Sequence, residues 1–139
     1  METIDQELQT KAMVAARRII NKNLELAPDH NLLVIFDKSS EQVADVFRDV
    51  AEKILDTGRV VMIDLDDDGY KPRPITKFDT LLAVKIALQR SQAVIIIYNH
   101  AGVEEVDAVD LPILNICNSH KIKFITRIGL TLELLAQLS

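Results

Sequence analysis

A chain of 139 residues, 48% of them hydrophobic, is long enough to form one domain with its own core, so it needs no disulfide or metal for support. The formal net charge of −5 excludes the strongly basic surface that nucleic acids and anionic membranes attract, and we expect neither as a partner. No apolar run approaches the roughly 20 residues of a membrane-spanning helix. The first residues form no basic and then apolar leader, and Cys117 has no second cysteine to pair with. We therefore expect a cytoplasmic protein.

The first segment has the periodicity of an amphipathic helix. Its apolar residues recur at steps of three or four, with Ala12 and Ala15 in the middle of a narrow stripe. Pro28 interrupts this pattern, because proline cannot donate a backbone hydrogen bond and restricts the residue before it. The predicted organisation is an N-terminal helix within residues 1–25, a βα repeat core over residues 30–139, and a single α/β domain over residues 1–139.

Four apolar runs predict the strands of a parallel sheet. They are rich in Val, Ile and Leu and lack the alternation of half-exposed strands, which is typical of strands covered by helices on both faces. The intervening segments are too long for hairpins and have helical periodicity. The predicted strands cover residues 31–36, 60–65, 92–98 and 122–126. The helices that connect or follow them are predicted near residues 39–57, 76–88, 110–117 and 130–138.

Right-handed crossovers between four such strands give the doubly wound order 2-1-3-4, a Rossmann- or flavodoxin-like α/β sheet. Ligands bind such sheets where the chain direction of the crossovers reverses, outside the carboxyl ends of the first and third strands. The polar residues expected there suit a small polar or anionic ligand. The predicted ligand-binding residues are Asp37, Ser39, Ser40, Asn99 and His100.

No catalytic residue, metal ligand or cofactor is predicted from these strand ends. The four glycines are scattered, so the chain has neither a dinucleotide-binding fingerprint nor a P-loop. The turn at 64–69 matches only the opening of an EF-hand calcium loop, because Ile75 stands where the loop requires a bidentate Glu. A solvated acidic turn explains it best, and whether Asp64–Asp68 binds a cation stays open.

Asp64 and Asp66 also permit a different interpretation, in which they are catalytic residues. The segment 61–66 looks like the nucleophile motif of haloacid-dehalogenase-type phosphatases, in which the first Asp attacks the phosphoryl group and the second acts as acid and base. The motif lies here on the second strand instead of the first, and no later acidic pair follows it. A metal-dependent hydrolase or phosphatase that uses Asp64 and Asp66 is therefore the alternative hypothesis.

Three segments carry a resemblance to a known family. They are residues 26–36, 91–96 and 124–131, which comprise a proline turn before the first strand, a long apolar third strand, and a strand followed by Gly129 and Thr131. Together they resemble the N-terminal domain of the aminopeptidase T-like leucyl aminopeptidases, a family of thermophilic metallo-aminopeptidases, and of their dihydroxypyridine-dioxygenase relatives. In that family, the C-terminal domain holds the metal and the catalytic groups.

The resemblance implies an α/β scaffold without the metal-binding domain, either as a separate protein or as a piece of a longer, metallo-aminopeptidase-like enzyme. Our leading hypothesis is a non-catalytic scaffold that acts by self-association or by binding a small ligand. The alanine stripe of the first helix suits close packing, and the last helix has more leucines than a four-stranded sheet needs. We therefore expect a homodimer.

Overall fold

The computed structural model of the chain describes residues 2–70 and 72–138, with side chains from residue 6 onward. Its sheet has four parallel strands in the order β2-β1-β3-β4, which confirms the predicted α/β topology. The strands are β1 (Leu32–Phe36), β2 (Val60–Asp64), β3 (Ala93–Ile96) and β4 (Lys123–Thr126). Leu32 is level with Val60 on one side and with Ala93 on the other, and Ala93 is level with Lys123. The amino ends of all four strands therefore lie along one edge of the sheet and their carboxyl ends along the other.

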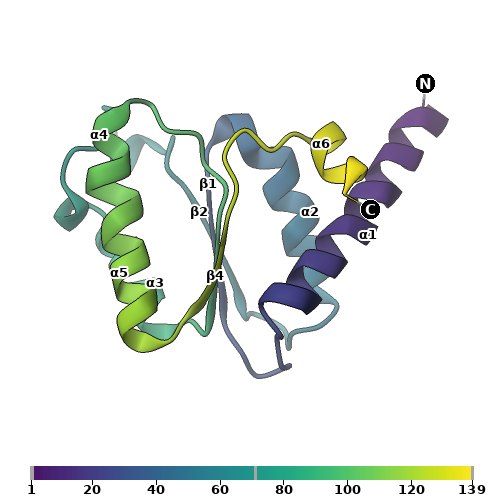
Figure 1. Cartoon of the computed structure of the whole chain (residues 1–139), viewed down its shortest axis with the longest axis horizontal. Helices are drawn as coiled ribbons and strands as arrows, with labels where there is room; N and C mark the ends of the chain where they lie inside the picture. Colours follow the sequence, from purple (N-terminus) through teal and green to yellow (C-terminus); the bar gives the residue numbers. More distant parts are fainter. Residues whose placement is uncertain (1, 71, 139) are drawn as a thin grey trace.

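Helices cover both faces of the sheet, as Figure 1 shows. One face is covered by α1 (Glu2–Asn23), α2 (Glu41–Glu52) and α6 (Leu132–Gln137), and the other by α3 (Leu82–Arg90), α4 (Val103–Glu105) and α5 (Leu111–His120). No helix in the described part of the chain is long and apolar enough to cross a membrane.

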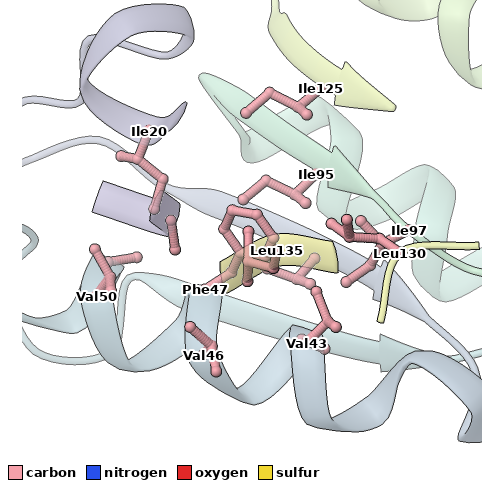
Figure 2. Close-up of a cluster of buried hydrophobic side chains, with 14 of the residues drawn as sticks. Ile20, Val43, Val46, Phe47, Val50, Ile95, Ile97, Ile125, Leu130 and Leu135 are labelled. Atoms are coloured by element: carbon pink, nitrogen blue, oxygen red, sulfur yellow. The ribbon is translucent and has the colours of Figure 1, made fainter. Parts of the chain in front are cut away.

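The first core forms under α1, α2 and α6. Phe47 of α2 is fully buried in it, and Leu135 of α6 belongs to the same cluster, as Figure 2 shows. Ile20 of α1 and Ile95 of β3 belong to the same cluster. Side chains from the first and last helices therefore share one core.

The second core lies between the sheet and the helices α3 and α5. Tyr98, which follows β3, and Cys117 of α5 are both buried in it. Burial raises the pKa of the Cys117 thiol to about 11, because the apolar surroundings disfavour the thiolate. This agrees with an inert, structural cysteine.

The alanine stripe of α1 does not face a partner surface. Ala12 and Ala15 are fully buried in the first core, and α1 packs against both α2 and α6 of its own chain. The small side chains allow these helices to approach closely. The part of the dimer argument that rested on this stripe was therefore wrong.

Two helices begin at other positions than the sequence indicated. The helix expected from Asp110 starts earlier, at Val103, and runs through a π-helical turn at Val106–Asp110 into α5. Pro112 follows this wider turn, at the point where its missing amide and its ring disturb a regular helix. The helix expected near residue 76 becomes α3 only at Leu82, after a 3-10 turn at Phe78–Thr80.

Candidate functional site at the carboxyl edge of the sheet

Asp37, Ser39 and Ser40 lie together directly after β1. Oδ1 of Asp37 accepts hydrogen bonds from the hydroxyls of Ser39 and Ser40, both at 2.8 Å, and from the Ser40 amide at 3.2 Å. The Ser40 hydroxyl accepts in turn from the Asp37 amide at 3.0 Å. These reciprocal bonds form a capping box on a 3-10 turn, Lys38–Ser40, that leads into α2. Asp37 therefore caps the 3-10 turn, and Ser40 stands at the start of α2 without a side-chain capping bond to that helix.

Asn99, which follows β3, joins this group to the ends of two other strands. Its amide donates to Oδ2 of Asp37 at 3.1 Å, and its side-chain Nδ2 donates to the Ser39 hydroxyl at 2.6 Å. Its Oδ1 accepts from the Gly129 amide, beyond β4, at 2.7 Å. The structure thus brings four of the five predicted ligand-binding residues into one hydrogen-bonded group.

Arg73 occupies the place beside this group. The residue belongs to the loop between β2 and α3, and its side chain is only 10% exposed. Nη1 lies 2.9 Å from Oδ1 of Asp66 and 3.4 Å from Oδ2 of Asp37, and Nη2 donates to the Asn99 carbonyl at 2.7 Å. The guanidinium also lies 5.7 Å from the ring centre of Tyr98, within the range of a cation–π contact. The switch point of the sheet therefore holds a cation from the chain itself.

Glu105 of α4 is the main partner of this guanidinium. It is fully buried, and its two oxygens accept from Nε and Nη2 of Arg73 at 2.9 and 2.6 Å. They also accept from the amides of Ile75 and Ala101. Burial by itself would raise the pKa of Glu105, but these hydrogen bonds outweigh it, so the pKa lies below its ordinary value. The bond from Glu105 likewise raises the pKa of Arg73.

Asp64 and Asp66, the residues of the phosphatase reading, are both held by cations or amides. Oδ2 of Asp64 lies 3.2 Å from Nζ of Lys38, and its Oδ1 accepts from the Asp66 amide at 2.8 Å. Asp66 accepts from the Lys38 amide at 2.8 Å and from Arg73. The carboxylates of Asp64 and Asp66 thus already have cationic partners in Lys38 and Arg73.

His100, the fifth predicted residue, turns to a different partner. Its Nε2 lies 2.6 Å from Oδ2 of Asp110, whose other oxygen accepts from the hydroxyl of buried Tyr98. Burial and the bond to Asp110 both raise the pKa of Tyr98. His100 therefore fastens the π-helical turn that carries Asp110 to the end of β3 and lies outside the Asp37 group.

The resulting arrangement is an electrostatic lock. One guanidinium is surrounded by three carboxylates and a carbonyl from four separate segments, and no buried side-chain nitrogen or oxygen in the described chain lacks a hydrogen-bond partner. Within the described residues, no group of three His, Cys, Asp or Glu has the arrangement of a metal site. A search of protein-family models and of curated proteins finds no match to this chain.

Proposed function

We propose that the chain is a non-catalytic α/β scaffold, similar to the N-terminal domain of the aminopeptidase T-like family, and that it acts by self-association. The observation that supports this proposal is the position of Arg73. A ligand at the switch point would have to displace a guanidinium that three carboxylates hold, two of them almost fully buried. The geometry therefore favours association over the binding of a small ligand at the carboxyl edge.

The surface that we assign to self-association is the outer side of α6. Leu134 and Leu138 lie four residues apart, one helical turn, and are 47% and 50% exposed. The same helix buries Leu135 and Ala136 in the core, which fixes the two outer leucines relative to the sheet. A twofold pair that joins these faces would remove both leucines from water.

Sedimentation velocity at micromolar concentration tests the proposal. We expect about twice the chain mass of 15.6 kDa, and a folded monomer for Leu134→Glu. The matched control is Val14→Glu, because Val14 is exposed to a similar extent, 43%, on the outer side of α1. A monomeric parent chain, or a Leu134→Glu variant that still dimerises, would overturn this assignment. A charge on the alanine stripe of α1, such as Ala15→Glu, does not test self-association, because Ala15 is buried and the charge would unsettle the core.

A further inference from the structure

A groove with apolar walls lies beside the start of β2 on the α3 side of the sheet, away from both the Arg73 lock and the α6 surface. It has a volume of about 450 Å³. Its walls are Val61, Ala83, Ile86 and Ala87, of which Val61 and Ile86 are 43% and 44% exposed. The groove therefore offers aliphatic side chains from a strand and a helix that face each other across an open space.

The strand beside this groove is an edge strand with free backbone groups. The Arg59 carbonyl accepts from the Leu32 amide, and the Leu65 amide donates to the Phe36 carbonyl, so the odd-numbered residues of this strand turn toward β1. Even-numbered Val60 and Met62 consequently turn their N–H and C=O groups outward. No strand in residues 2–70 or 72–138 pairs with that side of β2. An extended segment can add to such an edge as a new strand.

Two arginines stand at one end of the groove. Asn31 contacts both residues, because its Oδ1 accepts from Nη1 of Arg59 at 3.2 Å and its Nδ2 donates to the backbone carbonyl of Arg90 at 2.8 Å. In the described part of the chain, no carboxylate forms an ion pair with either arginine. In a protein with a net charge of −5, this end of the groove is a local site for a negative charge.

We propose that the groove binds an extended peptide of a partner protein, which adds to the free edge of β2 in an antiparallel direction. A peptide that runs against β2 reaches the Arg59 end last. It places an aliphatic side chain against Val61 and Ile86, and an acidic residue or a C-terminal carboxylate next to Arg59 and Arg90. A second copy of β2 in twofold pairing would bring Arg59 directly opposite apolar Ile63 or Leu65, whereas a partner peptide can place an acidic residue directly opposite it.

Selection from a displayed library of random heptapeptides with free C-termini tests this inference. We expect the selected peptides to combine an aliphatic residue with an acidic residue or the terminal carboxylate. A labelled synthetic copy of the best peptide should lose affinity by about tenfold or more, which is about 1.4 kcal/mol, on Val61→Lys and on Arg59→Glu. The matched control is Val14→Lys, since Val14 and Val61 are equally exposed, and it should leave the affinity unchanged.

Amide hydrogen exchange of the unmodified protein gives a second readout that does not depend on any variant. Saturation with the peptide should slow exchange at the outward amides of Val60 and Met62. The inference is overturned by a selection with no enrichment, by enrichment of basic peptides, by equal binding to the groove variants, or by unchanged exchange along β2. Dimerisation that Val61→Lys abolishes would also overturn it, in favour of a second copy. A failure at this groove leaves the α6 assignment untouched, because Leu134→Glu tests that surface separately.

Discussion

Arg73 and Glu105 form a two-point ion pair in which both carboxylate oxygens accept from the guanidinium, at 2.9 and 2.6 Å, and Glu105 is completely shielded from water. The pair joins the loop after β2 to the helix that follows β3. This contact between side chains therefore helps to hold together two crossover segments on the same edge of the sheet. Parallel hydrogen bonds of this kind are stronger and more directional than those of a lysine.

Removal of the guanidinium should destabilise the domain strongly. We expect Arg73→Ala to cost about 3 to 5 kcal/mol, because it leaves Glu105 and Asp37 as buried charges without a cation. Urea unfolding measures the loss. The control is Arg127→Ala, which should stay within about 0.5 kcal/mol, since that side chain is exposed and donates to the carbonyl of the preceding residue, Thr126.

A double-mutant cycle separates the contribution of the ion pair to the free energy of unfolding from the effect of lost side-chain volume. Replacement of both partners, as Arg73→Met with Glu105→Leu, should cost less than the sum of the two single changes, by about 1 kcal/mol or more. Additive losses would mean that the two residues do not stabilise each other.

Acid should weaken the fold partly through Glu105. The pKa of Glu105 in the folded protein lies below its ordinary value, so the folded state binds this proton less tightly than the unfolded state. Its contribution is fully present above the unfolded pKa of about 4.3 and disappears as the pH falls through the lower, folded value. In urea unfolding from pH 7 to pH 3, the stability deficit of Glu105→Gln should therefore shrink below about pH 4.3. A deficit that is constant over this range would contradict the assignment.

The core of β3 should be far less tolerant of substitution than the acidic turn. Ile96 is 3% exposed in the second core, whereas Asp67 is exposed. We expect Ile96→Ala to cost about 2 to 5 kcal/mol through lost burial and the cavity that remains, and Asp67→Ala to stay within about 0.5 kcal/mol. Equal shifts in the urea midpoint would show that the sheet is placed incorrectly.

Divalent cations provide the test of the hydrolase alternative. A site at Asp64 and Asp66 that is filled at 100 times its dissociation constant would add about 2.7 kcal/mol of stability. Because Lys38 and Arg73 already hold these carboxylates, we expect no change of the melting temperature with Mg²⁺, Mn²⁺ or Ca²⁺. A rise of the melting temperature that is absent in the Asp66→Asn variant would instead support the hypothesis of a metal-dependent enzyme.

The sheet was predictable because burial imposes a local pattern on each strand. Val94, Ile95 and Ile96 read as one apolar run because helices cover both faces of the sheet. Handedness and crossover length then left the order 2-1-3-4 as the simplest arrangement. The same reasoning placed Asp37 and Asn99 at one edge, and their hydrogen bond confirms that they lie together.

The lock itself was not predictable, because nothing local distinguishes its residues. Arg73 lies in a loop between two prolines, and Glu105 lies in a polar segment without clear periodicity. Their contact depends on how an irregular loop and a short helix, 32 residues apart in sequence, fold over the sheet edge. One sequence feature could have drawn attention to Arg73: it lies in a loop with two prolines that follows an acidic turn. The prolines stiffen the loop, so that fixing the charged side chain there costs less conformational entropy than in a flexible segment.

The packing of α1 against α6 has a consequence for the order of events on the ribosome. Among the described elements, α1 is synthesised first and α6 last, yet Ile20 and Leu135 share one core (Figure 2). Because translation proceeds at about 5 to 20 residues per second, the apolar side of α1 is synthesised several seconds before the helix α6 that packs against it. Nascent chains that lack α6 should consequently keep this side open to chaperones, and the native core on this face should close only after α6 has left the exit tunnel.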